Sequence, residues 1–273
     1  MKKSNYTTFF KDIKVHGVEY AVDRTVKLGF EAVEILGSAR PSRWIKNREM
    51  LLSLKQLLAE NQLAVSCYSA VVDLLSENAD DVVEHALTHI EYAAEIGSPY
   101  FHHTLVPGLV MSSDLPSFDE AFERVIDNAT KIATACNRHG IVCLYEPQGL
   151  YFNGVSGLKK LIGEVRKRGC NVGVCGDVGN SLFVDCQPVD IFKEFAADIR
   201  HVHVKDYSIY TEPCDGCYKS VGGKYLLPAE VGEGDIDIKS CLSCLDNYDG
   251  FISFEFEADD EKIKRTIARL AAE

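Results

Sequence analysis

The sequence of 273 residues lacks the marks of an exported or membrane-spanning protein. Residues 1–10 include two lysines but no apolar segment and no small-residue cleavage site, so we expect no signal peptide. The longest stretch without a charged residue, 96–113, contains two prolines and two histidines, which is not typical of a membrane helix. We therefore expect a cytoplasmic protein with no membrane partner, in which the ten cysteines stay reduced.

Basic residues are also scarce relative to acidic ones. Lys and Arg number 29 against 41 Asp and Glu, which gives a formal net charge of −12. A surface of that sign repels phosphate backbones, so we expect no nucleic-acid partner. Hydrophobic residues at 46% and charged residues at 26% are ordinary for a globular chain, which excludes extensive disorder. Tryptophan occurs once, at Trp44, where we expect a packed loop anchor or a ring that stacks on a sugar.

Glycine-rich phosphate loops are absent, because neither G-x-G-x-x-G nor G-x-x-x-x-G-K-[ST] occurs. An open doubly wound sheet, the competing architecture, should carry such a loop after its first strand. Apolar periodicity instead predicts strands and helices in alternation, with no linker between them. We expect strands near 6–10 and over 32–36, 63–68, 100–104, 141–145, 172–175, 200–204 and 251–256. Helices are expected within 9–29 and over 48–61, 78–96, 118–139, 155–168, 188–199, 236–245 and 259–273.

Eight such β/α units fit a closed parallel barrel of about 250 residues. The fold class is therefore predicted as α/β, a (β/α)8 TIM barrel in a single domain over 1–273. In such a barrel the active site lies at the carboxyl ends of the strands, which directs attention to the residues placed there.

The last four predicted strands end in a cluster of metal-binding residue types. They carry Glu146, Asp177, His203 and Glu255 in turn. Three carboxylates at one height repel each other unless a cation lies among them. Three oxygen donors and one nitrogen suit Mn²⁺, Mg²⁺ or Co²⁺, and they also fit Zn²⁺. The alternative is that each residue only caps its own loop.

Six motifs that span most of the chain carry a family resemblance. The chain resembles the xylose isomerase-like superfamily of divalent-metal TIM barrels, which includes sugar phosphate isomerases and epimerases and family 2 AP endonucleases. The motifs are LGFEAVEI (28–35), YEP (145–147), GDVGN (176–180), HVHVKD (201–206), VGEGDID (231–237) and GFISFEFE (250–257). They are specific for the superfamily and much less so for any one member.

The resemblance implies roles for particular residues. It implies that Glu146, Asp177, His203 and Glu255 bind one divalent metal ion, with Mn²⁺ expected first, and that the two glutamates form an acid/base pair. Many members carry D-x-x-H where this chain has Asn180, whose amide can hold a sugar hydroxyl but cannot carry a proton. That departure and the net charge of −12 disfavour the endonuclease branch.

A site of this kind supports related reactions. A divalent ion polarises a carbonyl, a carboxylate removes the adjacent proton, and the metal holds the resulting cis-enediolate. We expect an isomerase or epimerase of a keto-sugar or related polyol. A lyase that eliminates from an inosose or 3-keto-glycoside is the alternative, and a non-catalytic barrel subunit is a third.

Further substrate contacts are predicted at strand ends and in the neighbouring loops. They are His103, Asn180, Lys205, Glu34 and Glu257. Strand alternation lets only one of His102 and His103 face the barrel mouth, and His103 is preferred. His201 is expected to be a packed, hydrogen-bonded residue deeper on the same face as His203.

The segment after the seventh strand is predicted as a long loop, 207–234, that acts as a lid or as a surface for a partner subunit or second copy. It holds Cys214 and Cys217, which form a C-x₂-C pair. A second pair, Cys241 and Cys244, completes a pattern that resembles a structural zinc site. The favoured interpretation is that all four are reduced thiols, with the second pair packed on a helix.

Overall fold

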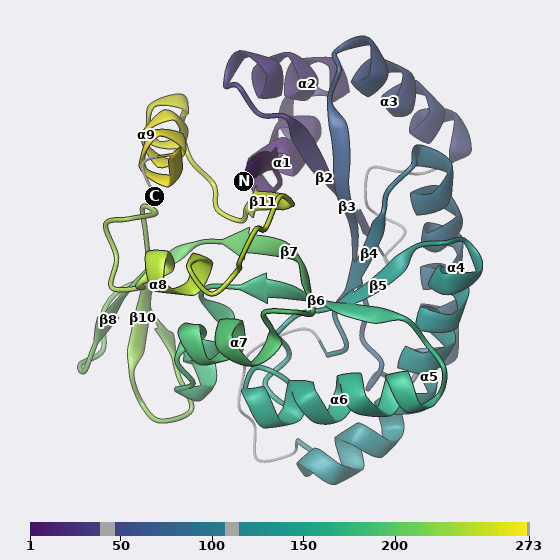
Figure 1. Cartoon of the computed structure of the whole chain (residues 1–273), viewed down its shortest axis with the longest axis vertical. Helices are drawn as coiled ribbons and strands as arrows, with labels where there is room; N and C mark the ends of the chain where they lie inside the picture. Colours follow the sequence, from purple (N-terminus) through teal and green to yellow (C-terminus); the bar gives the residue numbers. More distant parts are fainter. Residues whose placement is uncertain (39–46, 107–114, 272–273) are drawn as a thin grey trace.

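Eight parallel strands close into a barrel in the computed structural model, which describes residues 1–38, 47–106 and 115–271 (Figure 1). The order around the barrel is β1-β11-β7-β6-β5-β4-β3-β2. The strands are β1 (Lys2–Asn5), β2 (Ala32–Ser38), β3 (Ala64–Val71), β4 (Tyr100–His103), β5 (Val142–Tyr145), β6 (Val172–Asp177), β7 (Ile199–Val204) and β11 (Phe251–Phe254). The predicted (β/α)8 barrel is confirmed.

Helices cover the outside of this ring (Figure 1). They are α1 (Thr7–His16), α2 (Val18–Lys27), α3 (Arg48–Glu60), α4 (Ala79–Ile96), α5 (Phe118–Arg138), α6 (Val155–Lys167), α7 (Pro188–Phe195), α8 (Ile238–Leu242) and α9 (Asp260–Ala271). Local signals set several of their ends. Ser117 forms a capping box with Glu120 at the start of α5, and Pro188 opens α7. No helix in the described ranges is long and apolar enough to cross a membrane.

The first strand lies at Lys2–Asn5, so its predicted place near 6–10 is wrong; residues from Thr7 onward form α1. The prediction followed apolar residues, whereas the buried side chains of β1 are polar. Ser4 Oγ lies 2.7 Å from Ser66 Oγ, and Asn5 Nδ2 donates to Thr25 Oγ1 over 2.8 Å. These hydrogen bonds let a polar strand occupy the barrel interior.

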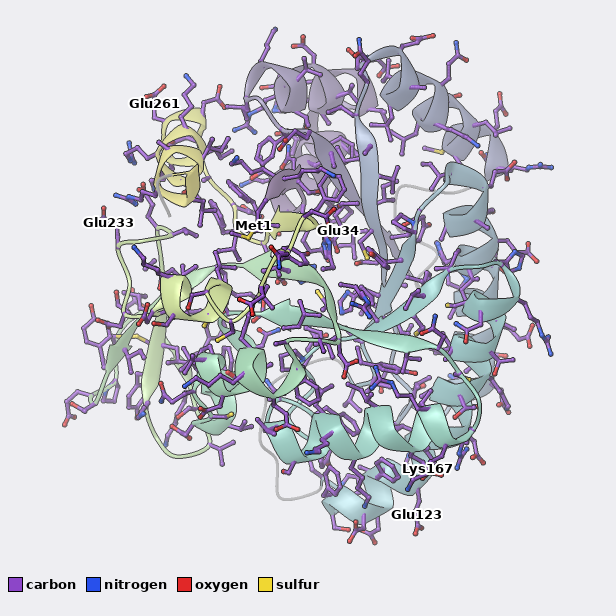
Figure 2. The ribbon with its side chains drawn as sticks, in the orientation of Figure 1. Met1, Glu34, Glu123, Lys167, Glu233 and Glu261 are labelled. Atoms are coloured by element: carbon purple, nitrogen blue, oxygen red, sulfur yellow. A yellow bond between two sulfur atoms is a disulfide. The ribbon has the colours of Figure 1, made fainter. Side chains whose placement is uncertain are left out.

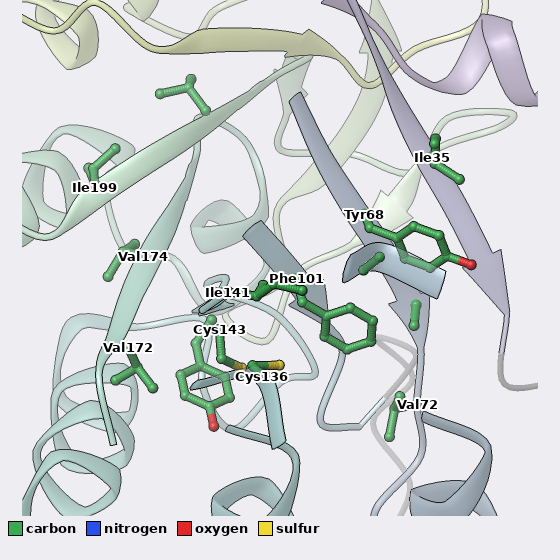
Figure 3. Close-up of a cluster of buried hydrophobic side chains, with 14 of the residues drawn as sticks. Ile35, Tyr68, Val72, Phe101, Cys136, Ile141, Cys143, Val172, Val174 and Ile199 are labelled. Carbon is green, nitrogen blue, oxygen red and sulfur yellow. The ribbon is translucent and has the colours of Figure 1, made fainter. Parts of the chain in front are cut away.

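The main hydrophobic core lies between the strands and the helices (Figure 3). It includes Ile35, Tyr68 and Phe101, which are fully buried. Inside the barrel the apolar part is small, consisting of Cys67, Leu144 and Cys175 with neighbours from the strand starts. Most other buried interior side chains are polar, which leaves the centre of the barrel available for chemistry.

The segment predicted as a loop over 207–234 contains a small antiparallel sheet. Its strands are β8 (Asp206–Tyr210), β9 (Tyr218–Lys219) and β10 (Tyr225–Ala229), in the order β8-β10-β9. The Asp206 carboxylate ties the segment down, because it accepts backbone N–H groups from residues 207, 232, 234 and 236 over 2.8–3.3 Å. We call this sheet and its connections, residues 206–234, the insert.

The cysteines differ from the sequence prediction at one pair. Cys214 and Cys217 are joined by a disulfide with Cα atoms 5.4 Å apart, and the other eight cysteines are free. The favoured interpretation of four reduced thiols is therefore wrong for Cys214 and Cys217. The alternative of a four-cysteine zinc site is also contradicted, because the disulfide uses two of the thiols that it needs and no metal-binding group among the described residues unites the two pairs. Cys241 is buried in the core beside α7, and Cys244 Sγ lies 3.2 Å from the carbonyl of Ser240.

Candidate functional site

Four strand ends bring their polar side chains to one point at the mouth of the barrel. Glu146 directly follows β5, Asp177 ends β6, His203 lies in β7 and Glu255 directly follows β11. Their ligand atoms all lie within 4.8 Å of one another. The structure therefore brings together the four residues that the sequence predicted as a ligand set. We call them the strand-end cluster.

His203 occupies the centre of the strand-end cluster. Its Nδ1 atom lies 2.9 Å from Glu146 Oε1 and 3.1 Å from Glu255 Oε2. Its Nε2 atom lies 3.0 Å from both carboxylate oxygens of Glu34. Burial alone would lower the pKa of His203, but the surrounding Cys175, Glu34 and Glu146 raise that pKa well above its ordinary value. The imidazole thus lies between Glu34, deeper in the barrel, and the carboxylates of Glu146 and Glu255 at the barrel mouth.

Asp177 is held in place by the turn that it begins. Its Oδ1 atom accepts the backbone N–H groups of Gly179 and Asn180 over 2.8 and 2.5 Å. Its Oδ2 atom is directed into the cluster, 3.1 Å from Lys205 Nζ. Burial raises the pKa of Asp177 to about 7, against the opposing effect of Lys205. The GDVGN motif therefore fixes one oxygen with the backbone and leaves the other for the site.

Lys205 supplies a buried positive charge beside these acids. Its Nζ atom lies 2.8 Å from Glu255 Oε2 and donates to Asn180 Oδ1 over 3.0 Å. Burial lowers the pKa of Lys205, but Asp177 and Glu255 outweigh that effect and raise the pKa well above its ordinary value. Lys205 therefore stays protonated. Lys205 and Asn180 both lie at the site, as the sequence predicted, although their contact with a substrate remains a prediction.

Glu34 lies in the middle of β2, because that strand runs on to Ser38 instead of ending at residue 36. It is fully buried inside the ring of strands (Figure 2). Besides His203, its carboxylate binds His201 Nε2 over 2.8 Å and accepts from Ser69 Oγ over 2.5 Å. Burial opposes its ionisation, yet His203 and His201 hold the pKa of Glu34 well below the usual range. Glu34 thus supports His203 from below.

The choice of His103 over His102 at the barrel mouth is wrong. His102 faces the interior, with Nε2 3.3 Å from Glu146 Oε2 and its ring against that of His203. His103 faces the helices, where its ring packs on Tyr145 and Nδ1 lies 2.8 Å from the Thr104 carbonyl. Phe101 could have indicated this orientation. It is a large apolar side chain that must pack under the helices, and it lies on the same face of β4 as His103.

One other predicted contact, Glu257, lies apart from the strand-end cluster. The Glu257 side chain is 55% exposed and pairs with Lys11, so strand alternation does not carry it to the same point as Glu255. Trp44 lies outside the described residues. His201, in contrast, is fully buried and bonded to Glu34 and to Ser253 Oγ, as expected for an interior packing residue.

The strand-end cluster has free ligand capacity for a cation. Glu146 Oε2, Asp177 Oδ2 and Glu255 Oε2 are buried and point into the cluster. Glu146 Oε2 lies 3.3 Å from His102 Nε2, and the other two oxygens pair with Lys205 Nζ over 3.1 and 2.8 Å. Each of these three side chains thus directs one carboxylate oxygen inward, which fits a divalent ion with oxygen-rich ligands. The set Glu34, His201 and His203 also offers ligand atoms within 4.8 Å, but its hydrogen bonds already occupy them.

Comparison with known proteins gives the family. Residues 22–273 match the family model of the xylose isomerase-like TIM barrel, while no curated protein matches the chain in sequence. The fold is similar to that of the probable 3-DHS dehydratase AsbF from Bacillus anthracis, with 18% identity over 99% of both chains and a TM-score of 0.77. It is similar to a D-allulose 3-epimerase from Methylomonas sp., with 14% identity, 100% and 97% coverage and a TM-score of 0.76.

A third structure of this fold is a xylose isomerase-like protein from Mycobacterium smegmatis in complex with magnesium, with 15% identity, 99% and 95% coverage and a TM-score of 0.73. At these identities the structural likeness concerns the fold. The family match covers most of the chain and includes every residue of the strand-end cluster. The chain belongs to the xylose isomerase-like TIM barrel family.

Proposed function

We propose that this protein is a divalent-metal-dependent isomerase or epimerase that acts on a keto-sugar or related polyol. The observation that carries the proposal is the position of Glu146 and Glu255, whose carboxylates approach the same nitrogen, His203 Nδ1, over 2.9 and 3.1 Å. Movement of a proton next to a carbonyl needs one group that removes the proton and one that returns it. Two glutamates beside a candidate cation site supply such a pair.

The metal would be held by Glu146, Asp177, His203 and Glu255. We propose Mn²⁺, because three carboxylates and one imidazole form a hard, oxygen-rich set; magnesium is the ion named for the Mycobacterium smegmatis structure. When bound, such an ion polarises the carbonyl and stabilises the negative charge that develops on its oxygen. His203 would present Nδ1, since Glu34 already occupies Nε2.

Other residues would hold the substrate and move its proton. Glu146 and Glu255 are the proposed base and acid. Return of the proton to the same carbon from the opposite face gives epimerisation, and its return to the next carbon gives isomerisation. Asn180 Nδ2 is buried and makes no hydrogen bond within the described residues, so it is available to a sugar hydroxyl. Lys205 places its ammonium 2.8 Å from Glu255, where it can bind a substrate oxygen that becomes negative.

Metal analysis combined with a deuterium-exchange screen tests the proposal. The purified protein is expected to hold about one divalent ion per chain, and solvent deuterium should enter the carbon next to the carbonyl of a keto-sugar, an inosose or a 3-keto-glycoside. Glu255→Gln should abolish exchange, while the matched change Glu194→Gln, at an exposed ion pair with Lys159, should leave it intact.

The products distinguish the two candidate reactions. Release of water or of an aglycone would establish the lyase alternative, whereas a product with the same composition as its substrate supports the isomerase or epimerase. Full exchange in Glu255→Gln, or a protein that binds no metal and labels none of these substrates, would contradict the proposed function.

A further inference from the structure

A cavity of about 550 Å³ lies beside the strand-end cluster, between the insert and the residues that follow β11. Lys205, Tyr207 and Glu255 line it toward the cluster, and Tyr218, Pro228 and Phe256 line it away from the cluster. We call it the insert pocket. Its volume is within the range of about 300–1,000 Å³ that is typical of small-molecule sites.

The insert pocket adjoins the proposed catalytic site. Glu255 and Lys205 belong to both, and the Lys205 ammonium lies between Glu255 and Asp177 at the end of the pocket nearest the cluster. A molecule whose reacting carbon lies beside Glu255 would therefore have space on this side for a further group. That space extends away from Glu146 and Asp177, which do not line it.

The walls of the insert pocket suit an uncharged ring. Tyr207 and Tyr218 both pack edge-on against Phe183, with ring centroids 5.7 and 5.9 Å away. Tyr218 is 51% exposed, so its ring is available to a ligand. Pro228 and Phe256 add apolar surface. Aromatic rings of this kind stack on the faces of sugars and of other rings.

The charges around the insert pocket disfavour a phosphate. Three of its acids already hold a cation: Glu255 pairs with Lys205, Glu257 with Lys11, and Glu230 with Arg265. A phosphate would have to displace one of these carboxylates from its partner and would lie close to the others. The remaining pocket cation, Lys262, lies exposed on α9 at the rim.

The insert is held rigidly enough to keep the pocket formed. Leu182, Phe183, Tyr207 and Leu226 make a small hydrophobic core beneath the sheet. Asp185 accepts from Ser220 Oγ over 3.0 Å, which ties the turn before β10 to the barrel. A wall fixed in advance loses little entropy when a ligand binds.

We propose that the insert pocket is a subsite for an uncharged ring attached to the reacting sugar, so that the substrate is a glycoside or similarly substituted sugar and not a free or phosphorylated monosaccharide. The inference rests on the proposed function for the position of the reacting carbon. Tyr218 is the specificity-determining residue, because it stacks on the attached ring while making no contact with the reacting atoms.

Binding to the metal-loaded protein tests this subsite without turnover. Calorimetry would compare methyl and phenyl β-glycosides of glucose, galactose, mannose and xylose, together with glucose 6-phosphate. In at least one pair the phenyl glycoside should bind roughly ten-fold more tightly than the methyl glycoside. Tyr218→Ala should remove that difference and Tyr218→Phe should retain it. Tyr210→Ala is the matched control, since Tyr210 is similarly exposed on the same sheet but does not line the pocket.

Several outcomes would overturn the subsite. They are equal affinities within every pair or no detectable phenyl glycoside binding, tighter binding of glucose 6-phosphate than of the phenyl glycosides, and equal losses in Tyr210→Ala and Tyr218→Ala. Metal content should be unchanged in both tyrosine variants. Deuterium exchange is scored separately on the panel of a keto-sugar, an inosose and a 3-keto-glycoside. Loss of the phenyl preference with exchange retained would therefore contradict only the subsite, and loss of exchange with the phenyl preference retained would contradict only the proposed function.

Discussion

The two faces of the barrel wall follow different rules, even where they are formed by adjacent residues. On the face toward the helices, Tyr68, Phe101 and Tyr145 are fully buried in the main hydrophobic core. On the inner face, the next residue in sequence after Tyr145 is Glu146, which is buried among His102 and His203. Burial is equal on the two faces, but one excludes charge and the other concentrates it.

The difference shows where stability and chemistry reside. Outside the wall, the buried Tyr145 hydroxyl has a local partner, because it donates to the carbonyl of Ala129 in α5 over 3.2 Å. Inside it, the buried Glu146 Oε2 and Asp177 Oδ2 face nitrogen atoms of charged or titratable side chains, His102 Nε2 over 3.3 Å and Lys205 Nζ over 3.1 Å. Buried charged groups are costly in a purely structural interior, which supports the proposed role of the inner face in the reaction.

The largest contrast is expected between Glu146→Gln and Tyr145→Phe. Replacement of Glu146 removes a proposed base or acid and one charge of the ligand set, so deuterium exchange should fall roughly 10³-fold. Tyr145→Phe removes only one hydrogen bond and should lower the free energy of unfolding by about 1 kcal/mol. Exchange assays and denaturant unfolding on both variants measure the two effects. A loss of exchange in Tyr145→Phe as large as in Glu146→Gln would remove the distinction between the faces.

Phe101→Ala tests the outer face by itself. Phe101 is fully buried and its ring lies 6.0 Å from that of Tyr68, so its truncation should destabilise the fold by about 3–5 kcal/mol. The metal content per folded molecule should stay unchanged, because the ring points away from the strand-end cluster. Chemical unfolding and metal analysis of the folded fraction give both values. Unchanged stability together with loss of metal in Phe101→Ala would contradict this expectation.

Glu34→Gln tests the lower part of the inner face. The Glu34 carboxylate holds His203 Nε2 at 3.0 Å and thereby turns Nδ1 toward Glu146 and Glu255. Such supporting carboxylates typically contribute about 10–100-fold to metal affinity, so Glu34→Gln should weaken binding of Mn²⁺ by that factor. A competition titration with a chelating dye measures it, and Glu31→Gln, at the exposed position directly before β2, is the control. Unchanged affinity in Glu34→Gln would show that His203 needs no such support.

The sequence predicted the outer face and the strand-end cluster well, because both follow regular rules. Apolar periodicity placed the strands and helices, and strand ends placed Asp177 and His203. The prediction failed where polar side chains point inward, as in β1, because burial of Ser4 depends on its hydrogen bond to Ser66 of β3. The partnership of Glu34 with His203 spans 169 positions and depends on how the ring of strands closes. No local pattern carries that information.

His102 and His103 offer the finest comparison, because one step along β4 carries the chain from the inner to the outer face. His102→Gln should lower deuterium exchange about ten-fold, since it removes the imidazole 3.3 Å from Glu146 that holds the pKa of this glutamate down together with His203. His103→Gln should leave exchange unchanged and cost about 1 kcal/mol of stability through its contact with the Thr104 carbonyl. Equal exchange rates in the two variants would mean that facing the interior is not sufficient for a role in the reaction, whereas the expected difference would show that the inner imidazole of β4, and not the outer one, acts on Glu146.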